Sequence, residues 1–406
     1  MKFWYTLLLT WLLAALAFAQ AQANEPPTNG ERAFKIQGFG TLGIARSDNE
    51  EVQYIRDLSQ PDGLTEDWSG KIDSVLGLQA SYRFSEEAEG VLQAISRYRY
   101  DGSYDPEISW AFLRFEPEPG FSLRAGRLGT EFFMLADSRL VGYSNLTVRP
   151  PPDFFHNLIF SYFDGVDVSA TRPAAAGLLR GKLFAGLSPE TSPFIKPLEW
   201  DMSGSLMLGG HLDYLSGPWQ IRLAHARIRF ERDPPLDTLV LAETGAPGYL
   251  SVVPEMSAAD KWSGFSSLGL VYDEGPLQLQ AMWSRIDHET ASYEDVQAAY
   301  AIAAYRFGPL SPYLGYSWTK TSPDRIAPTN TPYDAITASL FPQTHGDQHT
   351  WFLGARWDFQ PNMALKAQVD RIDANPCSIS PFRDGTSSAC WSGEMTVYSL
   401  ALDFVF

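Results

Sequence analysis

The sequence predicts an all-β fold, a closed antiparallel transmembrane β-barrel of about 16 strands. Three observations lead to this prediction. Apolar and polar residues alternate along most of the chain, short turns alternate with long loops, and aromatic residues gather at the strand ends. Beyond the N-terminus there is no uncharged apolar stretch of about 18 residues, which excludes a bundle of membrane helices.

The alternation is clearest at the C-terminal end. Tyr398, Leu400, Leu402, Phe404 and Phe406 share one face of the last predicted strand, and mostly small or polar residues occupy the other. A strand with one apolar face lies between an apolar and a polar environment. The same period of two runs through the segments that begin at residues 34, 72, 277, 351 and 363. Residues 87–100, 106–116 and 219–230 alternate less cleanly, so we expect β-bulges in these three segments.

The connections between the predicted strands fall into two classes. One class is short and rich in Gly, Pro and acidic residues, as in Ser216-Gly217-Pro218 and Gln360-Pro361-Asn362. The other is long and irregular, at about residues 47–67, 129–164, 188–204, 231–261, 319–348 and 373–393. This pattern predicts hairpins with tight turns at one rim and long loops at the other. A soluble β-sandwich is the alternative, but it would neither separate its loops by length nor carry aromatic residues at both strand ends.

Composition and charge exclude further classes. Hydrophobic residues make up 45% of the chain, enough to bury a large surface, so a disordered chain is excluded. The chain has 31 basic and 48 acidic residues, and its net charge of −17 argues against a nucleic-acid partner. If the barrel holds a pore, the negative charge predicts a mild preference for cations.

The N-terminal segment has the features of a secretory signal peptide. Lys2 precedes an apolar core from Leu7 to Phe18, and Ala21-Gln22-Ala23 follows as a cleavage site. We therefore expect a signal peptide over residues 1–23 and a barrel over residues 24–406; an uncleaved anchor helix is the alternative. Export also predicts a disulfide between Cys377 and Cys390, with two free thiols as the alternative.

Several motifs resemble the general (diffusion) porin superfamily of Gram-negative outer-membrane β-barrels. They are Gln37-Gly38-Phe39-Gly40-Thr41-Leu42-Gly43, Arg124-Ala125-Gly126-Arg127-Leu128, the segments 136–143 and 148–151, and the C-terminal Phe406. The resemblance implies a bacterial outer-membrane protein that passes small hydrophilic solutes and ions by passive diffusion. It also implies a homotrimer surrounded by outer-membrane lipid and recognition of Phe406 by the barrel-assembly machinery. The Pro-Glu-Phe-Gly-Gly loop motif of the enteric porins is missing, which weakens any residue-level map of a constriction.

In porins the third long loop folds into the barrel, and the matching segment here is residues 129–164. It carries the apolar run Phe132-Phe133-Met134-Leu135, suited to packing against a barrel wall. Acidic residues on such a loop face basic residues across the narrowest point of the pore. The candidate constriction residues are Arg97, Arg99, Arg124, Arg127, Glu131, Asp137 and Arg139. An outward loop whose arginines pair with lipid phosphates or nearby carboxylates is the alternative.

No motif in the sequence points to catalysis, a cofactor or a metal. Gly38-x-Gly40-x-x-Gly43 has the spacing of a dinucleotide-binding loop, but the strand pattern continues through it where a helix is required. His345 and His349 are placed in a polar loop and lack the Glu of a zinc-protease helix. We therefore expect a porin and no enzyme. The alternatives are a channel selective for phosphate, a sugar or an organic acid, and a plugged barrel acting as an enzyme or adhesin.

Overall fold

The computed structural model describes residues 34–195, 197–323, 326–340, 345–376, 378, 382–384 and 390–406. Within these residues, sixteen antiparallel strands form one closed barrel, as the sequence predicts. The expected signal peptide lies outside the described residues, and so does Cys377, so its pairing with Cys390 stays a prediction. None of the helices in the described ranges is both long and apolar enough to cross a membrane.

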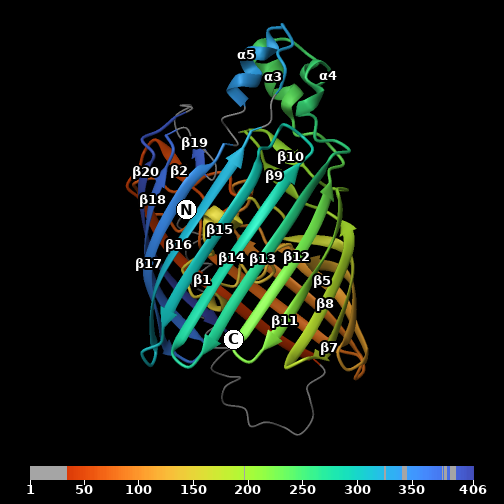
Figure 1. Cartoon of the computed structure of the whole chain (residues 1–406), viewed down its shortest axis with the longest axis vertical. Helices are drawn as coiled ribbons and strands as arrows, with labels where there is room; N and C mark the ends of the chain where they lie inside the picture. Colours follow the sequence, from red (N-terminus) through yellow and green to blue (C-terminus); the bar gives the residue numbers. More distant parts are fainter. Residues whose placement is uncertain are drawn as a thin grey trace.

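The barrel strands follow one another around the wall in chain order (Figure 1). They are β1 (Phe34–Ser47), β3 (Val75–Arg83), β4 (Ala88–Arg97), β5 (Glu107–Glu118), β6 (Phe121–Gly129), β7 (Tyr162–Ala174), β8 (Gly177–Leu187), β11 (Leu206–Ser216), β12 (Trp219–Arg229), β13 (Trp262–Glu274), β14 (Leu277–His288), β15 (Asp295–Tyr305), β16 (Leu310–Ser322), β17 (Asp347–Gln360), β18 (Met363–Ala374) and β20 (Glu394–Val405). β1 closes the barrel by pairing with β20, with Leu42 opposite Leu402. Backbone hydrogen bonds of 2.8 and 2.9 Å between Gly38 and Phe406 place both strand ends at the same rim.

That rim carries the tight turns. Gly217 and Gly275 have φ angles of 54° and 57°, a left-handed conformation that favours glycine, and each sits between two barrel strands. The opposite rim carries the longer loops. Short elements occur within them: β2 (Val52–Tyr54), η1 (Gly142–Ser144), α2 (Pro152–Phe155), β9 (Thr191–Pro193), β10 (Glu199–Asp201), α3 (Leu236–Thr244), α4 (Tyr249–Val252), η2 (Pro254–Met256), α5 (Tyr333–Leu340) and β19 (Phe382–Asp384). Figure 1 shows α3, α4 and α5 standing above this long-loop rim.

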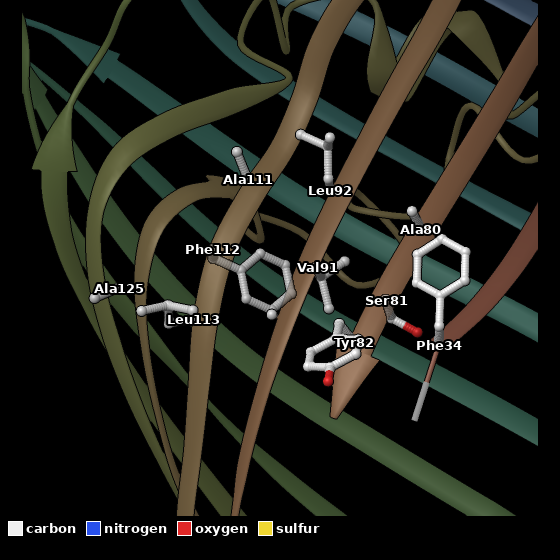
Figure 2. Close-up of a pocket in the computed structure, with 11 residues that line it drawn as sticks. Phe34, Ala80, Ser81, Tyr82, Val91, Leu92, Ala111, Phe112, Leu113 and Ala125 are labelled. Carbon is white, nitrogen blue, oxygen red and sulfur yellow. The ribbon is translucent and has the colours of Figure 1, made fainter. Parts of the chain in front are cut away.

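The two faces of each strand differ as the alternation predicts. Large hydrophobic side chains lie exposed on the outer wall, and among them Leu183 is 67% and Leu353 is 61% exposed. Figure 2 shows one part of this wall, an apolar hollow of about 390 Å³ across β1 and β3–β6. Phe34, Leu92 and Leu113 are among the residues that line the hollow. An outer wall of this kind suits contact with hydrocarbon.

Three expectations about local structure need correction. The register shifts once where β4 meets β5, because adjacent Gln93 and Ala94 face Trp110 and Ile108. The bulge expected in residues 106–116 is therefore present, whereas β4 has no extra residue and β12 pairs regularly over residues 219–229. Two of the connections at the long-loop rim, residues 98–106 and 289–294, are short ones that the sequence pattern did not separate from strands. His349 lies in β17 and not in a loop, because that strand begins at Asp347.

Candidate functional site

The candidate site is built around the segment between β6 and β7, residues 130–161, called here the lumen loop. Its two ends are joined at the barrel wall, where Thr130 Oγ1 donates a hydrogen bond of 2.9 Å to the carbonyl oxygen of Phe160. The backbone N–H of Thr130 also donates to the carbonyl oxygen of Ser161, at 3.1 Å. These two hydrogen bonds close the base of the loop and so fix the direction in which the rest of the loop leaves the wall.

Aromatic side chains hold one part of the lumen loop against strands β13–β15. The Phe132 ring lies 5.0 Å from that of Phe265 on β13, and the Phe154 ring lies 5.1 Å from that of Tyr300 on β15. Phe133 and Phe155 complete the cluster, and all six rings are buried. Edge-to-face contacts between rings add about 0.5–1.5 kcal/mol per pair to the free energy of burial. This part of the lumen is therefore filled by side chains.

Glu131, at the start of the lumen loop, docks in a cluster of cations on the wall formed by β6, β8, β11 and β12. Its carboxylate accepts hydrogen bonds from Lys182, from Arg124 at 3.2 Å and from His211 Nε2 at 3.0 Å, and Arg222 lies 3.9 Å away. Burial alone would raise the pKa of Glu131, but the hydrogen bonds from His211 and Lys182 hold this pKa below its usual range. The carboxylate therefore stays ionised at neutral pH.

Two wall carboxylates complete this cluster. Arg124 Nε donates to both oxygens of Asp167 at 3.0 Å, and Arg222 donates to both oxygens of Asp213 at 2.5 and 2.9 Å. Bidentate pairs of this kind fix the planes of both guanidinium groups. Glu131 thus meets cations whose positions are already set by the wall.

Arg149 holds the lumen loop on the wall opposite Glu131. This fully buried side chain donates to Asp73 at 2.6 and 2.8 Å, to Asp370 on β18 at 3.3 Å and to Ser399 on β20 at 2.7 Å. A buried cation is tolerated only where charged partners and hydrogen bonds replace its water. Arg149 therefore joins the loop to two strands and to the segment before β3.

Lys366 on β18 fastens the middle of the lumen loop. Its Nζ lies 2.8 Å from Asp403 Oδ2 and donates to the carbonyl oxygens of Gly142, Asn145 and Thr147 at 2.8, 2.6 and 3.0 Å. A Cβ atom at Gly142 would overlap the side chains of Thr41 and Asp403, so only glycine allows this close approach. The loop therefore crosses the lumen from the β6–β12 wall to the β18–β20 wall.

Glu190 also fastens the lumen loop, at the long-loop rim. The buried carboxylate of Glu190 accepts hydrogen bonds from the backbone N–H groups of Ser161 and Tyr162, at 2.7 and 3.3 Å. Burial raises the pKa of Glu190 to about 7. This residue therefore titrates in the physiological range while it holds the C-terminal end of the lumen loop.

The structure brings together three of the seven residues proposed from the sequence. Arg124 and Glu131 form an ion pair, and Asp137 lies beside them, where its charge acts on that of Arg222. Asp137 is also exposed to the lumen, as is Leu135. The inward side chains of Arg114 on β5 and Arg180 on β8 are accessible as well.

The other four proposed residues have different positions. Arg97 and Arg99 both lie close to Glu107 at the long-loop rim, with Nε–Oε distances of 3.2 and 3.8 Å. Arg127 pairs with Asp164 on the outer side of the wall, because three positions separate it from the inward Arg124. Arg139 is buried inside the lumen loop, where its guanidinium donates to the carbonyl oxygens of Ala136 and Phe160, each at 3.0 Å.

Sequence reasoning missed the wall residues that face the loop. Lys182, His211 and Arg222 come from three different strands, and only the strand register places them in neighbouring rows. The available signal was the alternation along residues 177–187 and 206–216. It puts Lys182 and His211 on one face of their strands and neighbouring leucines such as Leu183 and Leu212 on the other face. That signal gives the face of each residue but not its partner.

No family model matches the sequence, and no curated protein matches it. Solved structures do match. An anion-selective porin from Comamonas acidovorans shares 12% identity over 92% of this chain and 99% of its own, with a TM-score of 0.55. OmpF of Salmonella typhi, in complex with daunomycin, shares 12% over 92% and 97%, with a TM-score of 0.55.

A third similar structure is OmpT, an outer-membrane protein of Vibrio cholerae, with 10% identity over 94% of this chain and 100% of its own and a TM-score of 0.54. At these identities the likeness concerns the fold. The chain has the fold of a porin-type outer-membrane β-barrel.

Proposed function

We propose that this protein is an outer-membrane channel through which small hydrophilic solutes and ions diffuse passively, with no chemical step. One observation carries the proposal. Inside a closed barrel with an apolar outer wall, the lumen loop carries acidic residues to a row of wall cations and leaves charged side chains accessible beside it. Such a site passes hydrated solutes by size and makes apolar solutes lose hydration without compensation.

The solute path runs past Asp137, Arg114 and Arg180. These side chains are accessible in the lumen, whereas the β13–β15 side is filled by the aromatic part of the lumen loop. The narrowest point then has a carboxylate on the loop and guanidinium groups on the wall. We also propose that the channel has the mild preference for cations that the net charge predicts.

Location and assembly follow from the same proposal. The signal peptide over residues 1–23 would direct export, and the C-terminal Phe406 would be recognised by the barrel-assembly machinery before insertion among outer-membrane lipids. One of the similar structures of Vibrio cholerae OmpT is described as a trimer form. We propose a homotrimer for this chain as well.

The test is single-channel conductance of the refolded protein in a planar bilayer under a salt gradient. The expected result is stepwise ohmic opening, often in threes, with a reversal potential of the sign that indicates cations. Conductance that saturates with one solute, or is blocked by it, would replace general diffusion by a selective channel for phosphate, a sugar or an organic acid. A folded barrel without conductance would contradict the proposal and favour an enzyme or adhesin.

A further inference from the structure

The outer wall contains a groove of about 990 Å³ across β8 and β11–β14. Its lower part is lined by outward side chains that are exposed and apolar. They are Leu183, Leu212, Leu223, Leu268 and Trp283, while Leu208 lies opposite Arg227 nearer the long-loop rim. Gly210 and Ser266 also line it, and a Cβ atom at Gly210 would lie 2.7 Å from Leu183 Cδ2. These two small residues stand between the larger side chains that line the groove.

The end of the groove nearest the long loops is cationic and aromatic. His225 and Arg227 occupy successive outward positions near the end of β12, above Leu223. The Arg227 guanidinium lies 4.6 Å from the centre of the Trp262 ring and 3.4 Å from Glu289, and His225 Nδ1 lies 2.9 Å from Ser266 Oγ. Both side chains are exposed, so neither is committed to a buried partner.

We propose that this groove binds a phosphate-bearing lipid, with an acyl chain along the leucines and the phosphate at His225 and Arg227. A cation on the lipid-facing wall of a barrel is destabilising near the bilayer midplane and is tolerated at the interface, where headgroups lie. Trp262 beside Arg227 is the kind of residue that occupies that level. The groove therefore pairs an apolar channel with a cationic end at the depth expected for a headgroup.

The exposed pair of Arg227 with Glu289 does not oppose this assignment. Exposed ion pairs contribute about 0–1 kcal/mol, so a phosphate with more acceptor oxygens can displace the Glu289 carboxylate. The apolar hollow in Figure 2 provides a contrast, because no Arg, Lys or His lines it. It should take acyl chains without regard to their headgroup.

The proposal depends on membrane insertion of the barrel, but not on conduction. It is tested on the refolded protein in detergent micelles, by native mass spectrometry with dimyristoyl phosphatidic acid as the probe. Dimyristoylglycerol, which lacks the phosphate, and inorganic phosphate alone are the comparison ligands. We expect the phosphatidic acid to bind at least about tenfold more tightly than either.

Three variants locate the site. The double variant His225→Gln and Arg227→Gln should weaken phosphatidic acid binding about tenfold, the effect of losing about 1.4 kcal/mol. Ser266→Trp should weaken it by filling the groove while His225 and Arg227 remain. Arg371→Gln removes an outward arginine of similar exposure that pairs with Glu394 on the opposite side, and should leave binding unchanged.

Equal binding by the double variant and by Arg371→Gln would overturn the proposal, as would equal binding of the phosphatidic acid and dimyristoylglycerol. Dissociation of an oligomer in the double variant would also overturn it, because a second copy of this chain would then cover the groove. Conductance of each variant is recorded in parallel. Unchanged conductance with lost lipid binding supports the lipid site, and a silent wild type contradicts only the proposed channel.

Discussion

The lumen loop is held by two different kinds of contact on different walls of the same barrel. On the β13–β15 side, rings from Phe132, Phe154 and Phe155 pack against apolar inward side chains. On the β6–β12 and β18–β20 sides, Glu131 and Arg149 are held by ion pairs. Packing tolerates small shifts, whereas a buried ion pair with one member removed leaves an unpaired charge. The packed side and the two charged sides should therefore respond differently to mutation.

The largest effect is expected at Arg149. Arg149→Met leaves the buried carboxylates of Asp73 and Asp370 without their cation and should lower the free energy of unfolding by about 3–5 kcal/mol. Urea unfolding in detergent, followed by tryptophan fluorescence, measures this loss. Arg172→Met is the control, since Arg172 and Glu118 form an exposed pair and its change should be about 0–1 kcal/mol. Equal losses in the two variants would contradict a buried ionic anchor.

A slightly smaller loss is expected on the packed side. Phe154→Ala removes a ring in contact with Phe133, Phe155 and Tyr300 and should cost about 3 kcal/mol. The same urea titration measures it. Phe154→Leu retains most of the volume and should cost less than about 1.5 kcal/mol. If the leucine variant loses as much as the alanine variant, ring geometry and not filling of space holds this side.

The packed side also marks the limit of prediction from sequence. Alternation and turn composition are local, so they correctly predicted the number of strands and the rims of most connections, but not the short connections 98–106 and 289–294 at the long-loop rim. On β15, however, both faces are apolar: Val296, Ala298 and Tyr300 point inward, and Ala299 and Ala301 point outward. Alternation alone cannot show that the inward set is covered by a loop 140 or more positions earlier in the chain.

The charged sides show the same limit in a different form. The odd spacing of Arg124 and Arg127 places them on opposite faces of one strand, yet the prediction put both at the constriction, which is wrong for Arg127. The partners of Glu131 were not accessible in this way, because Lys182 and His211 become neighbours only through the pairing of β8 with β11. The direction of a side chain is encoded locally, whereas the composition of an ion cluster depends on the closure of the whole sheet.

A pH-dependent effect is expected at the rim. The pKa of Glu190 is about 7 in the folded protein and near the ordinary glutamate value of 4.5 when unfolded. Between these values the unfolded state binds fewer protons, so stability is fully present below pH 4.5 and falls as the pH rises towards 7, by about 3 kcal/mol at most. Urea titrations from pH 4.5 to 7.5 measure this slope. Glu190→Gln should flatten it, and an unchanged slope in that variant would assign the pH dependence to other groups.

The smallest effect on stability, but a direct one on function, is expected where the loop is exposed. Asp137→Asn changes an accessible side chain and should alter the free energy of unfolding by less than about 0.5 kcal/mol. Because Asp137→Asn removes a negative charge beside the proposed path, the reversal potential in a salt gradient should shift towards anions.

Arg180→Gln removes an accessible inward cation on β8 and should shift the reversal potential towards cations. Asp287→Asn changes a residue on the outer wall and should leave the reversal potential unchanged. If the two lumen variants shift the reversal potential in opposite directions, the accessible lumen side chains set ion selectivity and the buried contacts only hold the loop. If neither variant moves the reversal potential, the narrowest point lies elsewhere in the barrel.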